Sequence, residues 1–218
     1  MAKKIAIFSG KGGVGKSTLS AALAVAAGDA TLIDCDPQAS LSHWGDLRDS
    51  EPEVISLPPT RLKSKLPTIS SKVIIVDTPG ALVAGTIEAL KMMDLILVVT
   101  PVDTFELAAL NDTLNTAEVA QVPVALVVNR LHPQAKAESA LELVNELGVP
   151  VCPVVIRERA VHRHLLIEGR TCMDHTHSAG VRSAMTELKA VWEWILAQLD
   201  ADPSQTVQAT GGSDGASA

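Results

Sequence analysis

Short apolar runs alternate along the chain with longer segments in which apolar positions recur at helical spacing. Six of these runs predict strands, near residues 4–9, 30–34, 73–77, 94–99, 123–128 and 151–155. The segments between them are long enough for crossover helices, which predicts a mostly parallel, twisted sheet with helices on both faces. The expected fold class is therefore a single α/β domain, in which ligands bind beyond the carboxyl ends of the strands.

Helix boundaries are clearest at the two ends of this pattern. The first helix should begin around Lys16 and run through an alanine-rich stretch to a stop at Gly28. The last should cover roughly residues 179–199. Residues 45–72 contain four prolines and predict a loop-rich connection with one or two short helices. We expect one domain over residues 1–200 and a disordered tail over 201–218, where Gly, Ser, Ala and Thr dominate.

Composition narrows the class of protein. A chain of 218 residues with 47% hydrophobic content can bury one sizeable core. Its longest apolar run, Leu95 to Val99, is far shorter than the roughly 18 to 20 residues that span a membrane, so we expect a soluble protein. Three cysteines without a CxxC pair favour a cytosolic location. The net charge of −7 means that any polyanion must meet a local basic patch.

The strongest chemical signal follows the first apolar run. Residues 10–18 fit GxxxxGK[ST], the pattern of a phosphate-binding loop whose glycines expose backbone amides. Lys16 should reach the β- and γ-phosphate oxygens, and Ser17 should bind Mg²⁺. Because Lys16 fills the usual role, the extra Lys11 can bind a phosphate held by another subunit, which would couple nucleotide binding to dimerisation. The residues expected to contact the nucleotide here are Gly10, Lys11, Gly12, Gly13, Val14, Gly15, Lys16, Ser17 and Thr18.

Carboxylates follow two of the predicted strands. Asp77 ends an apolar run. A carboxylate at such a strand end can hold Mg²⁺ through water, opposite the loop serine. The alternative is that Asp77 is a turn or cap residue. Asp34 and Asp36 flank Cys35, and the period of two directs both carboxylates towards the nucleotide crevice. Asp36 can orient or deprotonate the attacking water and reach the metal through water, while Asp34 would support the metal shell or the loop. Cys35 fits a small buried side chain.

The choice of base depends on the residues after the run 123–128. They read Asn129-Arg130-Leu131-His132, whereas a guanine site normally has Asn-Lys-x-Asp, and a histidine cannot replace that carboxylate. Adenine is therefore favoured, with Asn129 at its edge. Residues 77–80 also fit DxxG, a weak signal for a γ-phosphate switch. The predicted ligands are ATP and Mg²⁺.

These motifs together resemble the ParA/MinD group of deviant Walker ATPases over nearly the whole chain. Residues 11–18 look like the deviant loop of that group, residues 34–38 like its second acidic motif, and Asp77 like its third. Segments 36–44, 100–106 and 156–161 are similar to the small ParF-type partition ATPases. A MinD-like terminal membrane helix is not recognisable in residues 206–218, so we expect no membrane partner.

The resemblance implies a single-domain P-loop NTPase that forms a sandwich homodimer on binding ATP. Lys11, Lys16 and Asp36 would be its catalytic residues, with Lys11 contacting the partner's nucleotide. The dimer would bind nucleoid DNA without sequence preference and separate after slow Mg-ATP hydrolysis, stimulated by a ParB/ParG-like or cargo-adaptor protein. We expect a role in plasmid or chromosome partition. The alternatives are the positioning of a protein cargo, such as carboxysomes or chemoreceptor clusters, and, more remotely, iron–sulfur carriage, which needs bridging cysteines.

Two locally basic segments could meet DNA. The segment 157–189 carries six basic residues against four acidic ones, and a second run has no acid between its members. Pairing such patches across a dimer would multiply weak contacts to DNA phosphates and so strengthen DNA binding. The alternative is that each of these charges is simply a solvated surface side chain. The basic residues are Arg157, Arg159, Arg163, Arg170, Arg182 and Lys189 in the first segment, and Arg61, Lys63, Lys65 and Lys72 in the second.

Overall fold

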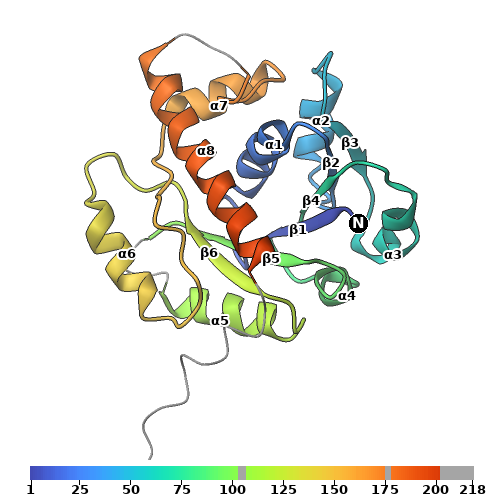
Figure 1. Cartoon of the computed structure of the whole chain (residues 1–218), viewed down its shortest axis with the longest axis horizontal. Coiled ribbons are helices and arrows are strands. Elements are labelled where there is room, and N and C mark those ends of the chain that lie inside the picture. Colours follow the sequence, from blue (N-terminus) through green and yellow to red (C-terminus); the bar gives the residue numbers. More distant parts are fainter. Residues whose placement is uncertain (103–106, 175–177, 202–218) are drawn as a thin grey trace, which may run out of the picture.

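The computed structural model describes residues 1–102, 107–174 and 178–201, and its strands form one parallel sheet (Figure 1). The strand order is β3-β2-β4-β1-β5-β6, and each neighbouring pair runs parallel. Three central strands are buried at every position, as expected for a sheet covered on both faces. The strands are β1 (Lys3–Phe8), β2 (Ala30–Asp34), β3 (Glu53–Ser56), β4 (Val73–Asp77), β5 (Leu95–Thr100) and β6 (Val124–Val128).

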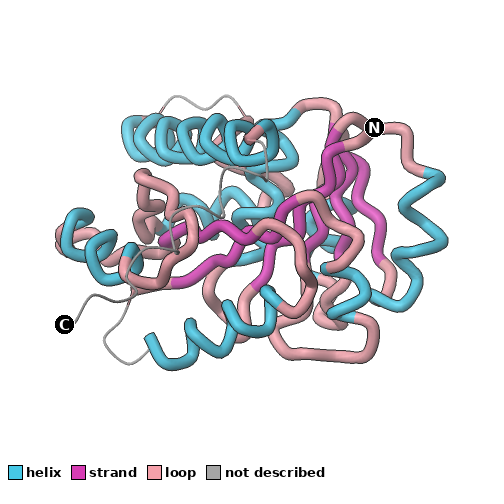
Figure 2. Tube along the Cα trace, turned by 60° about the horizontal axis from the view of Figure 1, so that its bottom comes forward, coloured by secondary structure: helices cyan, strands magenta, loops and turns pink. Residues whose placement is uncertain are grey.

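Helices cover both faces of this sheet, which lies between them in Figure 2. Side chains alternate between the two faces: Ile5 and Ile7 of β1 pack in the core under α1 and α8, whereas Ala6 and Phe8 pack on the opposite side. The helices are α1 (Lys16–Ala27), α2 (Ser40–Asp46), α3 (Leu62–Lys65), α4 (Thr86–Leu90), α5 (Leu107–Glu118), α6 (Ala137–Asn145), α7 (Ala160–Ile167) and α8 (Ala179–Asp200), with short 3₁₀ turns at Pro59–Arg61 and Leu66–Thr68.

The predicted α/β class is confirmed, and so are five of the six predicted strands and both predicted helices. The run 151–155 is the exception, because it contributes only an isolated bridge between Val151 and Leu126. Pro150 precedes this run and Pro153 lies within it, and proline cannot donate a hydrogen bond to a neighbouring strand. Strand β3 lies in the segment predicted as loop-rich; it is short, half-exposed and paired only with β2 at the sheet edge. The short helices expected in that segment are present.

The predicted tail, including residues 206–218 where no membrane helix was expected, lies outside the described residues from residue 202 onwards. Within the part of the chain that the structure describes, none of the helices combines the length and the apolar character needed to cross a bilayer.

A buried arginine ties α2 to the connection between α7 and α8. The Arg48 side chain is only 4% exposed, and its guanidinium lies 4.6 Å from the centre of the Trp44 ring. Its Nη atoms donate to the Asp174 carboxylate at 2.9 and 3.1 Å and to the Gly169 carbonyl at 2.8 Å. Burial acts to raise the pKa of Asp174, but hydrogen bonds from Arg48 and Thr171 outweigh it and hold that pKa below its usual value.

We predict that Arg48→Ala lowers the free energy of unfolding by about 3 kcal/mol, because it leaves a partly buried carboxylate without its partner. A group with a lowered folded pKa adds stability above its unfolded pKa and loses it as the pH falls, so the effect should shrink below the ordinary value of 3.8. Urea unfolding at several pH values measures it. Arg170→Ala, which removes an exposed pair at 3.8 Å, is the control and should cost at most about 0.5 kcal/mol. Equal losses in the two variants would contradict the prediction.

Candidate nucleotide-binding site

The loop between β1 and α1 has the backbone geometry of an anion cradle. Gly13 and Gly15 have φ values of 77° and 90°, in the left-handed region that favours glycine. A Cβ on Gly15 would also lie 2.6 Å from Asn129 Nδ2, so no larger residue fits there. Gly15 caps α1, and the first turn of that helix directs its amides and its positive dipole end towards the loop.

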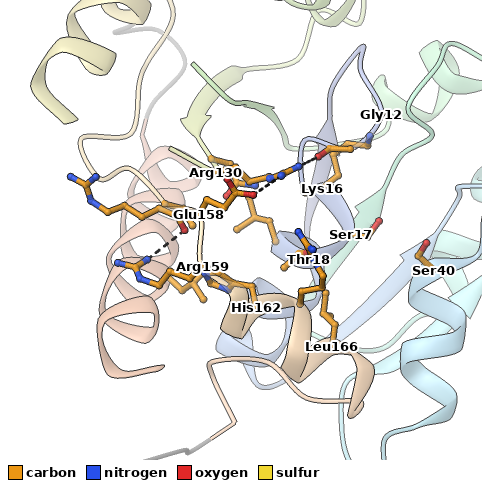
Figure 3. A pocket seen from close by; sticks show the side chains of 18 of the residues that line it. Gly12, Lys16, Ser17, Thr18, Ser40, Arg130, Glu158, Arg159, His162 and Leu166 are labelled. Carbon is orange, nitrogen blue, oxygen red and sulfur yellow. Dashed lines mark hydrogen bonds and ion pairs between the residues drawn. The ribbon is translucent and has the colours of Figure 1, made fainter. Parts of the chain in front are cut away.

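A cavity of about 490 Å³ covers this loop at the carboxyl edge of the sheet (Figure 3). It brings together predicted residues of the loop, Asp36 and Asn129, which come from three different strand ends. It continues from there to α7 and α8. The lining residues are Gly12, Gly13, Gly15, Lys16, Ser17, Thr18, Leu19, Asp36, Gln38, Ser40, Asn129, Arg130, Ile156, Arg157, Glu158, Arg159, His162, Arg163, Leu166 and Leu188.

Lys16 is a buried cation in the wall of this cavity. It is 6% exposed, and its Nζ lies 3.4 Å from the carbonyl oxygen of Lys11. Burial lowers the pKa of Lys16, whereas the nearby charges of Asp77 and Asp36 act to raise it. A phosphate in the cavity would add negative charge beside the ammonium and favour its charged form.

Asp77 lies directly behind Ser17. Its Oδ2 accepts a hydrogen bond from the Ser17 hydroxyl at 2.6 Å, and its Oδ1 accepts one from the Ser20 hydroxyl at 3.0 Å. The carboxyl group is fully buried, and this burial raises its pKa to about 7. The hydrogen bonds from Ser17 and Ser20 and the charge of Lys16 act to lower the pKa, but burial outweighs them. Because Ser17 donates its proton to Asp77, the lone pairs of its oxygen remain available in the cavity. This donor set fits Mg²⁺ bound by Ser17, with Asp77 reached through water.

Asp34, the last residue of β2, and Asp36, two residues further on, have different partners. Asp36 lines the cavity, and its Oδ1 accepts from the Gln38 amide at 2.9 Å. Asp34 is 1% exposed, and its Oδ2 accepts from the amides of Leu41 and Ser42 at 3.0 Å each. The carboxylate of Asp34 therefore anchors the first turn of α2 and does not point into the nucleotide crevice as expected.

Asn129 lines the cavity, but its amide group serves the loop. Its Nδ2 donates to the carbonyl of Val14 at 2.8 Å, and the residue is 5% exposed. The next residue, Arg130, has a positive φ of 54° and extends between the loop and Glu158, which precedes α7 (Figure 3). Its Nη1 donates to the carbonyl of Gly13, and its Nη2 pairs with Glu158 at 2.6 Å. The predicted position of Asn129 at the adenine edge stays a prediction, and the structure adds this role in supporting the loop.

Lys11 and Lys16 face different surroundings. Lys11 is exposed and lines a separate small cavity with Ser9, Thr100, Pro101 and Thr113, among others, whereas Lys16 lines the nucleotide cavity. One loop therefore carries two lysines on two sides.

Two arginines of the basic segment 157–189 are engaged in internal contacts. Arg159 forms a double hydrogen bond with Glu187 at 2.5 and 2.6 Å, and Arg157 donates to the carbonyls of three residues between 132 and 135. Arg163 lines the nucleotide cavity. In the second run, Arg61 and Lys63 are exposed, while Lys72 lies 3.6 Å from Asp29.

The wall formed by Arg130 and α7 was not predicted from the sequence. One signal was present: the segment 156–163 follows an apolar run, so it also reaches the carboxyl edge of the sheet. Its basic residues instead indicated a surface for DNA, because the pairing of Arg159 with Glu187 depends on the tertiary fold.

A family model described as the CobQ/CobB/MinD/ParA nucleotide binding domain matches residues 5–169. The chain belongs to this family. Its relatives include the maintenance of carboxysome distribution protein A of Halothiobacillus neapolitanus, 31% identical over 88% of this chain and 95% of that protein. The predicted membership of the ParA/MinD group is confirmed.

Solved structures of ParA/MinD-type proteins share this fold. A plasmid partition protein of Borrelia burgdorferi, bound to AMPPNP, superposes with a TM-score of 0.73 over 91% of this chain and all of that one, at 18% identity. An ATP complex of a McdA variant from Cyanothece gives a TM-score of 0.70 at 17% identity, over 89% of this chain and 96% of that one. At these identities the likeness concerns the fold, and the family assignment rests on the matched domain model.

We predict that Asp77→Asn removes a pH-dependent destabilisation of the nucleotide-free protein. The folded pKa of Asp77, about 7, lies above its ordinary value of 3.8, so its contribution to stability is fully present below 3.8 and is lost as the pH rises through 7. The free energy of unfolding of the variant, measured in urea, should therefore increase relative to the unmodified protein between pH 5 and pH 8. Asp112→Asn, on the exposed face of α5, is the control and should show no such trend. A difference between Asp77→Asn and the unmodified protein that is constant with pH would contradict the prediction.

Proposed function

We propose that this chain is a Mg²⁺-dependent ATPase that dimerises when it binds ATP and separates after hydrolysis. The division of the two loop lysines supports this most directly: Lys16 serves the cavity of its own chain, whereas Lys11 lies on another side of the same loop. In a dimer that faces loop to loop, Lys11 would reach the triphosphate of the partner. Family membership and the nucleotide complexes of the structural neighbours support nucleotide binding.

The site residues would divide the reaction among them. Lys16 and the loop amides hold the β- and γ-phosphates. Ser17 and, through water, Asp77 and Asp36 would hold Mg²⁺, whose charge neutralises the phosphate oxygens. Asp36 orients a water molecule for attack on the γ-phosphorus, and the bond to the β–γ bridging oxygen breaks to give ADP and inorganic phosphate. The partner's Lys11 stabilises the negative charge that develops in this step.

We further propose that the ATP-bound dimer binds DNA without sequence preference and uses the nucleoid as its track in the cytoplasm. Exposed Arg61 and Lys63 offer phosphate contacts on a chain that is acidic as a whole. Dimerisation doubles such a patch, so useful affinity appears only in the ATP state. A ParB/ParG-like or cargo-adaptor protein would stimulate hydrolysis and release the dimer.

Two kinds of cargo are compatible with the proposed ATP-dependent dimer: DNA and a protein assembly. Likeness to a plasmid partition protein supports DNA segregation. Two relatives that match nearly the whole chain are named for carboxysome distribution, and this observation favours a protein cargo. Deleting the gene in cells that encode it distinguishes the two: loss of a plasmid or of chromosome partition supports the first, and clustering of a protein assembly with normal DNA inheritance supports the second.

We predict that Lys11→Ala binds ATP but no longer dimerises with it, with the dimer weakened more than tenfold because an interfacial charge contact to the partner's phosphate is lost. Light scattering after size exclusion, with a non-hydrolysable ATP analogue, measures the dimer. Lys16→Ala should lose nucleotide binding itself, and Lys91→Ala, at an exposed position, should behave as the unmodified protein. An ATP-dependent dimer of unchanged affinity in Lys11→Ala would contradict the proposal.

DNA binding should follow the nucleotide state. We predict that the protein binds duplexes of unrelated sequence equally well with the ATP analogue, and only weakly with ADP. The logarithm of the binding constant should fall linearly with the logarithm of salt concentration, by about 0.9 for each phosphate neutralised. Fluorescence anisotropy at several salt concentrations measures this. Affinity that is the same with ATP analogue, with ADP and without nucleotide would exclude a switch that acts on DNA.

A further inference from the structure

One ring nitrogen of His162 is buried without a partner. Among the described residues, Nε2 of His162 is the buried side-chain nitrogen or oxygen atom that makes no hydrogen bond. The ring lies on α7 and forms part of the wall of the nucleotide cavity (Figure 3). A polar atom withdrawn from water without a partner is costly, so its place beside an open cavity indicates that a ligand completes its hydrogen bonding.

The other ring nitrogen already has a neighbour. Nδ1 of His162 lies 3.6 Å from Sγ of Cys172, which is 1% exposed. Burial raises the pKa of this thiol to about 11, so it keeps its proton and can donate it to Nδ1. Burial, assisted by the charge of Arg159, lowers the pKa of His162 and keeps the ring neutral. With Nδ1 as acceptor, the ring proton lies on Nε2, which then presents a donor.

The ring also occupies the part of the cavity that the phosphates do not need. Phosphates belong at the loop and at the first turn of α1. The wall that includes α7 and α8 adds apolar side chains, Ile156, Leu166 and Leu188, beside the charged residues of segment 157–163. A wall with both apolar and polar groups suits a nucleoside, whose base has apolar faces and polar edges. Asn129, expected at the base, has its amide group engaged by the loop.

We propose that His162 is a specificity residue that donates a hydrogen bond through Nε2 to the nucleoside half of the bound nucleotide. The acceptor is a ribose oxygen or a ring nitrogen on the purine edge. This inference rests on the proposed binding of ATP. The residue lies away from the γ-phosphate and takes no part in bond breaking.

The test compares ADP with pyrophosphate, which shares the phosphates and lacks the nucleoside. In calorimetric titrations, His162→Ala should bind ADP about tenfold more weakly, the factor expected for one lost hydrogen bond, and pyrophosphate as before. His162→Gln, which can place an amide nitrogen near the position of Nε2, should recover part of the loss. His164→Ala, at an exposed position of the same helix, is the matched control and should leave both affinities unchanged.

Analogues of ADP locate the acceptor. If it is on the ribose, 2′-deoxy-ADP binds the unmodified protein more weakly than ADP, and His162→Ala no longer distinguishes the two. If it is a nitrogen of the base, the deaza-ADP that lacks this nitrogen shows the same loss of discrimination.

Three results would overturn the inference. If His162→Ala binds ADP with unchanged affinity, the inference about His162 is rejected, while the proposed ATPase function still stands. If His162→Ala loses affinity for ADP and pyrophosphate equally, the inference is also rejected, and the ring has a structural role instead. If the unmodified protein binds pyrophosphate but gains nothing from the nucleoside of ADP or ATP, the proposed function fails together with the inference.

Discussion

The site depends on how the carbonyl groups of one loop are held. Asn129 donates to the carbonyl of Val14, Arg130 to that of Gly13, and Lys16 to that of Lys11. These three contacts fix the backbone of the loop in the nucleotide-free chain, because each holds a carbonyl group of a glycine-rich segment in one orientation. Two of the donors come from the residues just after β6, and Asn129 lies against Gly15 at the start of α1. The loop is thus organised by the tertiary fold as well as by its glycines.

The buried carboxyl group of Asp77, beside the loop, lowers the stability of the nucleotide-free chain, and the proposed binding of Mg²⁺ would offset this cost. Asp77 is fully buried, and its raised pKa means that ionisation at neutral pH opposes folding of the nucleotide-free chain. A carboxyl group tuned in this way responds strongly to a nearby cation, because the cation favours the charged form that burial disfavours. Binding of a metal with the nucleotide would therefore remove part of a strain that the empty site carries. Such coupling between ligand and fold is useful in a protein that must change state on binding.

Those features that depend on local sequence could be predicted, and those that depend on tertiary contacts could not. Continuous apolar runs identified the central strands because these are buried on both faces, and the loop pattern located the start of α1. Strand β3 was missed because its four residues are half-exposed and its pairing partner is distant in sequence. Asp34 and Asp36 share a strand end and looked equivalent, yet only the fold shows that α2 turns back onto Asp34. The link between Arg130 and Glu158, and the position of His162 beside the cavity, join segments about 30 residues apart or more, which no local pattern reports.

In the proposed function, the nucleotide site does not determine which cargo is selected. The residues proposed to hold phosphates and metal belong to the loop, β2 and β4, and the family includes proteins named for plasmid partition and for carboxysome distribution, so these residues alone do not distinguish the two roles. What differs between such proteins is the set of exposed groups that meet DNA and the adaptor. In this chain the strongest arginine contacts of the segment 157–189 are internal, since Arg159 binds Glu187 and Arg157 binds backbone carbonyls. Breaking the contact of Arg159 would leave the partly buried Glu187 without its partner, so, if the chain binds DNA as proposed, the exposed basic residues of the α3 region are better placed to contact phosphates.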